Sequence, residues 1–327
     1  MTSMTLAKAL NAGLRSALDT DSKTLIMGED VGRLGGVFRV TDGLQKDFGE
    51  HRVIDTPLAE SGIIGTAIGL AMRGYRPICE IQFDGFVYPA YDQIVSQLAK
   101  IHYRSQGQVK MPVVVRIPFG GGIGAVEHHS ESPEAYFAHT AGLKVVTCSN
   151  PADGYTMIQQ AVASDDPVIF FEPKRRYWEK GEVPDDVPAS DWYPLHSTRV
   201  VRPGTDATLV GYGPMVRTLL ESAEAAVEDG RDLEVIDLRT LSPLDLEPVY
   251  ASVERTGRLI VVHEAPFTLG LGSEIAARVT ERCFYALEAP VLRVTGYDTP
   301  YPPARLEDDY LPDLDRVLDA VDRSFSY

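Results

Sequence analysis

Residues 113–135 read VVVRIPFGGGIGAVEHHSESPEA. The apolar run at 113–117 predicts a buried strand, and it leads into a flexible glycine segment, two adjacent histidines and the expected start of a helix. A rigid strand followed by an adaptable loop with a polar tip can present an imidazole at the mouth of a cleft. Because histidine changes charge near neutral pH, this stretch indicates a site that moves protons.

Working outward, the first half of the chain alternates short apolar strands with helices. Apolar residues at helical spacing predict a first helix within residues 1–18, and a glycine- and alanine-rich helix is expected at 62–72. Asn150 and Pro151 have the character of an N-cap and a first helical residue, and Pro89 suggests another helix start. Strands are expected at 24–27, 77–83, 144–148 and 168–171. The alternation predicts an α/β fold with a mainly parallel sheet covered on both faces.

The pattern lapses at residues 180–197, where Pro184, Pro188 and Pro194 lie among acidic and small residues. A second α/β unit follows, with strands expected at 207–210, 233–238, 259–262 and 291–294. Its helices are expected at 216–228, 246–254, 273–287 and 314–324. The sequence therefore predicts two α/β domains, at 1–180 and 199–327, joined by a linker at 181–198.

Composition and charge narrow the classes of partner. The chain has 327 residues, of which 44% are hydrophobic and 24% charged, as in ordinary globular proteins. Its net charge of −16 disfavours nucleic acids and anionic membranes as partners and suits a basic protein. The acidity is equally explained as an aid to solubility.

The cysteines and the N-terminus bear on the compartment. Cys79, Cys148 and Cys283 are odd in number and far apart, which argues against a disulfide framework or a structural zinc site. The N-terminus lacks the pattern of a signal peptide, and no apolar run is long enough to span a membrane. We expect a cytoplasmic protein of bacterial type.

Three segments are candidates for chemistry. Glu60 precedes the helix at 62–72, and it is either an ordinary first-turn glutamate or a carboxylate held in an apolar pocket that shares a proton with a heterocycle nitrogen. Aromatic residues at 83–91 either pack in the core or form a stacking surface for a planar ring. His128 and His129 match neither a dinucleotide fingerprint nor an H-E-x-x-H metal site, so an active-site role and a surface position stay open.

In order, these segments resemble the β subunit of the thiamine diphosphate-dependent 2-oxo acid dehydrogenases. The resemblance covers nearly the whole chain. It rests on Met27-Gly28-Glu29-Asp30, Thr56-Pro57-Leu58-Ala59-Glu60, Glu80-Ile81-Gln82-Phe83, His129-Ser130-Glu131-Ser132-Pro133, Phe170-Phe171-Glu172-Pro173-Lys174, Asp237-Leu238-Arg239-Thr240, His263-Glu264-Ala265-Pro266 and Gly296-Tyr297-Asp298-Thr299-Pro300. The sequence around His129 and at residues 170–174 is most similar to the sequences of the branched-chain enzymes.

The resemblance implies a fold and residue roles. It implies a pyrimidine-binding first domain and a second domain like the C-terminal domain of transketolase. Glu60 matches the glutamate that hydrogen-bonds the aminopyrimidine of thiamine diphosphate, and His129 matches the histidine that faces the cofactor and takes part in acyl transfer to lipoamide. Phe86 matches a ring that stacks on the pyrimidine, and Leu58 and Gln82 match positions that line its pocket. His128 receives no role.

The resemblance also implies metals and partners. The Gly-Asp-Gly…Asn motif that holds Mg²⁺ and the diphosphate is absent from this chain, and in the family it belongs to the α subunit. A potassium ion near Val113, Val114 and Asp166 is a further implication. The expected partners are an α subunit, in an assembly of two α and two β chains, and a dihydrolipoamide acyltransferase core with its lipoyl and basic peripheral binding domains. The acidic segment Glu307-Asp308-Asp309 is a candidate docking surface for the basic domain, or simply a solvated face.

The resemblance leaves alternatives open. Pyruvate or acetoin dehydrogenase β subunits carry out the same chemistry on other substrates. A catalytically silent scaffold would keep the fold without turnover, although the intact Glu60 and His129 weigh against it.

Overall fold

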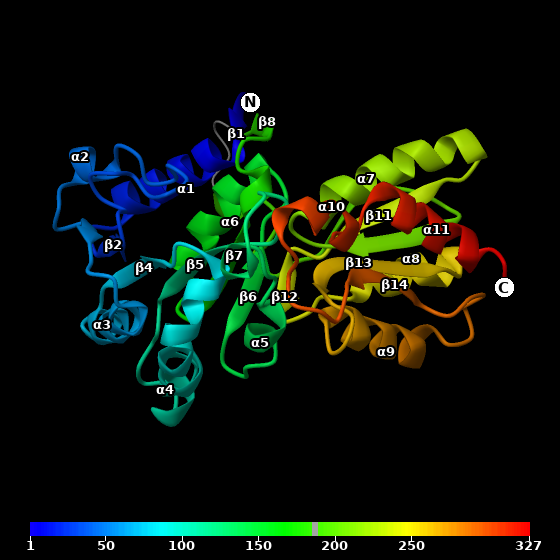
Figure 1. Ribbon diagram of the computed structural model, residues 1–327. Helices are drawn as coiled ribbons and strands as arrows, with labels where there is room; N and C mark the ends of the chain where they lie inside the picture. The colour runs from blue at the N-terminus through cyan, green and yellow to red at the C-terminus, as the bar shows by residue number, and fades with distance from the viewer. Residues whose placement is uncertain (185–188) are drawn as a thin grey trace.

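A computed structural model describes residues 1–184 and 189–327. The chain forms two α/β halves that lie side by side, each built around its own sheet (Figure 1). Pro188 and part of the expected linker at 181–198 lie outside the described residues.

The first half contains a seven-stranded sheet in the order β12-β6-β7-β5-β4-β2-β3. Its pairings are parallel except that between β12 and β6. The strands are β2 (Thr24–Gly28), β3 (Val53–Asp55), β4 (Arg76–Glu80), β5 (Val114–Phe119), β6 (Lys144–Thr147), β7 (Val168–Pro173) and β12 (Thr240–Ser242). The near-continuous apolar runs are explained by burial of both faces, as parallel sheets require.

Helices cover both faces of this sheet. Ile26, Ile78 and Val114 pack in one cluster with residues of α1 (Leu6–Thr20) and α6 (Pro151–Ala163). Neighbouring strand residues pack on the other face against α3 (Glu60–Met72) and α5 (Glu134–Ala138). The remaining helical segments of this half are α2 (Leu44–Phe48), η1 (Asp84–Ala90), η2 (Gln93–Leu98), α4 (Ala99–Arg104), η3 (Glu127–His129) and η4 (Lys174–Arg176).

Local signals for helix α6 are confirmed. The Asn150 side chain accepts a hydrogen bond from the Asp153 amide at 3.0 Å, and Pro151 is the first helical residue. An N-cap satisfies an amide that has no partner inside the helix, and proline at this position removes another one.

The structure differs from the expectation at Pro89. This residue lies inside the 3₁₀ segment η1 rather than at the start of an α-helix, and a π-helical turn, η2, separates it from α4. The expected apolar face is nevertheless present, because Ala90, Ile94 and Leu98 are fully buried. The apolar spacing predicts the buried face correctly, but it does not distinguish an α-helix from tighter or wider turns.

The expected first helix and the linker both contain a strand that the sequence reading missed. The helix begins only at Leu6, because β1 (Thr2–Thr5) pairs antiparallel with β8 (Lys180–Val183). Thr5 then caps the helix by accepting a hydrogen bond from the Lys8 amide. The two paired strands lie about 180 residues apart in the sequence. A pattern within a few neighbouring residues cannot indicate such a pairing.

The second half contains a five-stranded sheet in the order β14-β13-β10-β11-β9. Its strands are β9 (Arg199–Arg202), β10 (Ala207–Gly211), β11 (Leu233–Asp237), β13 (Leu259–Pro266) and β14 (Leu292–Gly296). The edge strand β9 was not expected, and it pairs antiparallel with β11. The helical segments are η5 (Ala189–Asp191), α7 (Met215–Ala226), η6 (Val227–Asp229), α8 (Glu247–Thr256), α9 (Leu271–Cys283), η7 (Ala304–Leu306), α10 (Glu307–Tyr310) and α11 (Leu314–Ser324).

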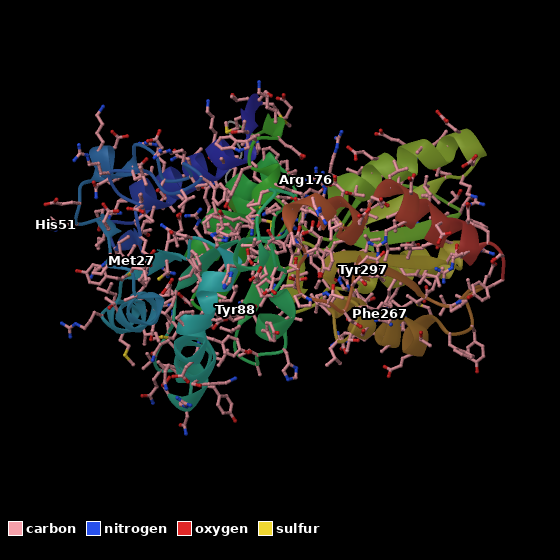
Figure 2. All side chains as sticks on the ribbon, in the orientation of Figure 1. Met27, His51, Tyr88, Arg176, Phe267 and Tyr297 are labelled. Atoms are coloured by element: carbon pink, nitrogen blue, oxygen red, sulfur yellow. The ribbon has the colours of Figure 1, made fainter. Side chains whose placement is uncertain are left out.

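The two halves share structure. Strand β12 belongs by sequence to the second half, but it adds to the sheet of the first half beside β6. One apolar cluster runs through both halves and includes Phe119, Phe171, Ile236 and Leu241. Side chains fill the boundary, where Arg176 donates to the carbonyl of Pro214 at 2.9 Å (Figure 2). Among the described residues, no helix has the length and apolarity needed to cross a bilayer.

Candidate functional site

The candidate site lies at the carboxyl edge of four neighbouring parallel strands, β5, β4, β2 and β3. The segments that follow these strands carry, in that order, His129, Gln82, Glu29 and Glu60. Because the carboxyl ends of parallel strands meet at one edge, residues far apart in sequence come together there, where α/β sheets commonly bind ligands.

His129 is held against two aromatic rings. It ends the 3₁₀ turn η3, and its ring centroid lies 4.2 Å from that of Phe83 and 5.3 Å from that of Phe86. Its Nδ1 atom is buried and has no hydrogen-bond partner within the described chain. Burial, and then the positive charge of Lys174, lowers the pKa of His129. The imidazole is therefore neutral at neutral pH and able to accept a proton.

Asp84 fixes the segment that carries His129. The Asp84 carboxylate accepts a hydrogen bond from the Glu131 amide at 2.8 Å and forms a buried ion pair with Lys174. Burial raises the pKa of Asp84 to about 6, against the opposing effect of Lys174. A Cβ atom at Gly85 would lie 2.6 Å from the carbonyl oxygen of His128, so this close approach requires glycine.

Two carboxylates lie together at the same edge. Glu60 is the first residue of α3 and is buried, and Glu29 follows β2. Burial raises the pKa of Glu29, and the negative charges of Glu60 and Asp30 raise it further. The Oε1 atom of Glu29 is buried without a partner. Glu29 therefore retains a proton more readily than an exposed glutamate does, and it can share that proton with a basic nitrogen of a bound heterocycle.

Gln82 contributes to the same edge. Its amide donates to the backbone carbonyl of Glu29 at 3.3 Å and approaches Asp30 at 3.5 Å. This contact ties the segment after β4 to the segment after β2. Of the residues that the resemblance implied, Phe86 lies against His129, while Gln82 contacts Glu29 and Glu60 acts electrostatically on Glu29.

Leu58 and His128 lie outside this group of residues. Leu58 has 79% of its surface exposed, so within this chain it lines no enclosed pocket. His128 is exposed and its Nδ1 atom lies 3.3 Å from the Glu127 carboxylate. The assignment of Leu58 to a cofactor pocket stays a prediction.

Glu29, Asp84 and Lys174 complete the site, and the sequence reading gave them no role, whereas it included Phe83 among the aromatic residues that could stack on a ring. Each of these residues lies at or just beyond a strand end of the same sheet edge, and this shared position is a signal that could have found them. Beneath them, Arg116 is fully buried and binds Glu80 at 2.6 Å and Glu172 at 2.6 and 2.9 Å. The sequence reading did not identify this ionic group, because Arg116 lies within the apolar run at 113–117.

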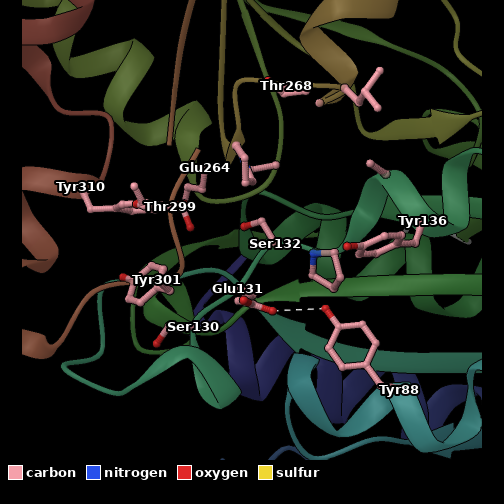
Figure 3. A pocket seen from close by; sticks show the side chains of 16 residues that line it. Tyr88, Ser130, Glu131, Ser132, Tyr136, Glu264, Thr268, Thr299, Tyr301 and Tyr310 are labelled. Atoms are coloured by element: carbon pink, nitrogen blue, oxygen red, sulfur yellow. Dashed lines mark hydrogen bonds between the residues drawn. The ribbon is translucent and has the colours of Figure 1, made fainter. Parts of the chain in front are cut away.

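A separate cavity of about 280 Å³ lies between the halves and is lined in part by Ser130, Glu131 and Ser132 (Figure 3). Tyr88 donates to the Glu131 carboxylate at 3.2 Å at its wall, and Glu264 and Tyr301 face it from the second half. Glu60, Gln82, Phe86 and His129 do not line it. We therefore place the candidate site at the sheet edge, where the titratable groups converge, and not in this cavity.

The residues suggested for potassium already have other partners. The Val113 carbonyl accepts the Val168 amide at 2.9 Å, and Val114 is paired within the sheet. Both oxygens of Asp166 are engaged, with His102 at 2.9 Å and Lys144 at 2.9 Å. In this arrangement these residues do not fit a cation site, and no chemistry is assigned to potassium here.

Comparison with protein families gives two matches along the chain. The transketolase pyrimidine binding domain matches residues 2–179, and the transketolase C-terminal domain matches residues 196–317.

Individual relatives span nearly the whole chain. A pyruvate dehydrogenase E1 component subunit beta from Leifsonia xyli is 64% identical, over 99% of this chain and 96% of the relative. A 3-methyl-2-oxobutanoate dehydrogenase subunit beta from Mycobacterium tuberculosis is 56% identical, over 98% and 92%. A 2-oxoisovalerate dehydrogenase subunit beta from Pseudomonas aeruginosa is 46% identical, over 99% and 95%.

Among solved structures, a split-gene transketolase described as an inactive beta4 tetramer is similar to this chain. The TM-score is 0.78 over 99% of this chain and 98% of that one, at 22% identity. At this identity the likeness shows a shared fold.

Proposed function

Because the chain belongs to the β subunits of 2-oxo acid dehydrogenase E1 components, we propose that it is half of a thiamine diphosphate-dependent enzyme. The other half is an α subunit, in an assembly of two α and two β chains. The substrates are branched-chain 2-oxo acids, and the acyl acceptor is a lipoyl group on a dihydrolipoamide acyltransferase. The observation that carries the proposal is the sheet edge where His129 lies against two rings and Glu60 acts electrostatically on Glu29.

The residues present fit a planar, nitrogen-containing ring. Glu29 and His129 each have a buried polar atom without a partner, and the rings of Phe83 and Phe86 offer apolar faces. Glu60, Gln82, Phe86 and Leu58 would hold the pyrimidine end of thiamine diphosphate. When bound, this cofactor supplies the electron sink for decarboxylation. We assign the Mg²⁺ and the diphosphate to the α subunit.

In the proposed reaction, side chains of this subunit bind and transfer protons. Glu60 hydrogen-bonds a ring nitrogen of the bound pyrimidine. The neighbouring Glu29 is protonated more readily than an exposed glutamate, because burial and the negative charge of Glu60 raise its pKa. His129, neutral at neutral pH, orients the incoming acceptor and exchanges a proton with it.

The requirement for two subunits gives the main test. The purified chain alone should not decarboxylate 2-oxo acids, and co-expression with its α subunit should give an active complex. Glu60→Ala in that complex should abolish turnover while assembly by gel filtration is preserved. Robust activity of the chain alone would contradict a shared site, and full activity of Glu60→Ala would favour the silent scaffold.

Substrate preference is tested by comparing 3-methyl-2-oxobutanoate with pyruvate and acetoin in the same complex. We expect the highest kcat/KM with the branched substrate. Pyruvate is the second candidate, because the 64% identical relative is named for it. A higher kcat/KM for pyruvate would overturn the branched-chain assignment and leave the reaction class intact.

We further propose that the acidic second half docks the basic binding domain of the acyltransferase, and that the domains span 1–180 and 199–327 with a linker at 181–198. All three cysteines are buried and free, which suits a cytoplasmic, reducing compartment.

A further inference from the structure

The segment that presents His129 is a closed loop. The Gly120 amide donates to the Glu131 carbonyl at 3.0 Å and joins the two ends of residues 120–131. Within the loop, His129 precedes the closing residue by two positions. Its place is therefore set by whatever holds the rest of the loop.

Glu307, from the other half of the molecule, holds the glycine part of this loop. Its carboxylate accepts hydrogen bonds from the Gly122 amide at 2.9 Å and the Gly124 amide at 2.9 Å. The Tyr301 hydroxyl donates to the same carboxylate at 2.6 Å. Glu307 is buried, so it is not part of the solvated acidic face that the sequence suggested, whereas Asp308 and Asp309 are exposed.

Glu264, on β13, holds the neighbouring residue. Its carboxylate accepts the Gly121 amide at 2.8 Å and lies 3.0 Å from the Arg175 guanidinium. Arg175 adjoins Lys174, which pairs with Asp84, and Asp84 binds the Glu131 amide. Charged side chains therefore bind the loop on both sides of His129: Glu264 accepts the Gly121 amide before it, and Asp84 accepts the Glu131 amide after it.

The loop is shaped for these carboxylates. Gly122 has a φ of +86°, a conformation that side chains other than glycine rarely adopt, and this conformation turns successive amides toward the second half. Outward-facing amides of this kind form a concavity that binds an anion. Here the anions are side chains of β13 and α10. Burying carboxylates is unfavourable unless their hydrogen bonds are made, and three of the bonds made here go to the backbone of a single loop.

We propose that Glu307 and Glu264 are positioning residues for His129, so that the second half of the chain sets the geometry of an active-site loop in the first half. The inference rests on the proposed function of His129. Loosening the loop displaces the imidazole from Phe83 and Phe86 without removing any group that touches substrate.

The first test is hydrogen exchange, which requires no activity. Glu307→Gln keeps the shape of the side chain but replaces one acceptor oxygen with a donor, so one loop amide loses its partner. In the complex with the α subunit, amides within 121–129 should exchange about tenfold faster or more. The matched control is Asp308→Asn, an exposed residue of the same short helix, which should leave this exchange unchanged.

The second test is the reductive acylation of an isolated lipoyl domain as a function of pH. Glu307→Gln should lower kcat about tenfold, because small displacements of a catalytic group carry large penalties. Release of the half-buried His129 from Phe83 and Phe86 should also move the acid limb of the pH profile to higher pH. A loss of stability alone would lower the amount of active enzyme and leave the limb in place.

Unchanged loop exchange in Glu307→Gln, or a fall in kcat with an unmoved acid limb, would overturn the proposal. If this variant does not fold, Tyr301→Phe removes the hydroxyl that donates to Glu307 and interacts with the Gly122 amide, and it should give smaller changes in the same directions. A wild-type complex without 2-oxo acid activity would refute the proposed function, while the exchange experiment would still decide whether Glu307 holds the loop.

Discussion

Burial sets the proton affinity of several carboxyl groups near the histidine loop. It raises the pKa of Asp84 to about 6 and the pKa of Glu134 to about 7, and in each case a hydrogen bond opposes the effect without cancelling it. Glu134 accepts the Tyr212 hydroxyl at 2.5 Å, and its other oxygen has no partner. The stability of this region therefore depends on pH within the physiological range.

For Glu134 the sign follows from linkage. Its folded-state pKa of about 7 lies above the ordinary value of 4.5, so its stabilising contribution is complete below pH 4.5 and is lost as pH rises through 7. The loss is on the order of 3 kcal/mol. Glu134→Gln should remove this part of the pH dependence, measured as the free energy of unfolding in urea at pH 5 and pH 8.

The exposed Glu228 supplies a control, since Glu228→Gln should keep the wild-type dependence on pH. An identical pH dependence in wild type and Glu134→Gln would show that Glu134 ionises normally.

Arg116 gives a second prediction for a single residue. Arg116→Met leaves the carboxylates of Glu80 and Glu172 buried without their cation. We expect a loss of about 3–5 kcal/mol in the free energy of unfolding. Arg217→Met, which breaks the exposed pair with Glu221, should cost under about 0.5 kcal/mol. Losses of similar size in the two variants would contradict the assigned role of Arg116.

At the scale of elements, the packing of η1 against η3 sets the height of the histidine turn above the sheet. Gly85 is the contact point, and a Cβ atom there would also lie 2.9 Å from the Cα of His128. The backbone of η3 must move if Gly85 gains a side chain.

Gly85→Ala should therefore lower kcat of the complex by about 10- to 100-fold, because His129 shifts with its turn. The cost in stability should stay near 1–3 kcal/mol. Parallel measurements of kcat and urea unfolding separate the two effects. Retention of wild-type kcat would mean that the loop absorbs the clash without moving the imidazole.

At the scale of the whole molecule, the net charge of −16 favours a basic partner and makes its binding sensitive to salt. Affinity for the proposed partner, the basic domain of an acyltransferase, should fall about tenfold or more between 50 and 500 mM salt, as titration calorimetry can measure. Joint replacement of Asp308 and Asp309 by asparagine should weaken binding, whereas Asp19→Asn, on an exposed part of the first half, should not. Salt-independent affinity would exclude an electrostatic docking face.

Sequence reasoning reached the fold class and much of the candidate site. The cap at Asn150, the parallel strands and the family resemblance follow from patterns within a few residues of each other, and these are the patterns that local physical chemistry fixes. The pairing of β1 with β8 and the placement of β12 beside β6 could not be read in this way. Each joins segments far apart in the chain and contains at most four residues in its strands.

By itself, the sequence determined the alternation of strands and helices, the glycine loop with its histidine, and the glutamate at the start of α3, because each depends on neighbouring residues. The tertiary structure alone decided which charges face one another. Glu307 looked like part of an acidic surface, yet it holds the amides of a loop some 180 residues earlier in the chain. Burial and hydrogen bonding between distant segments, which no local pattern encodes, gave this carboxylate its role.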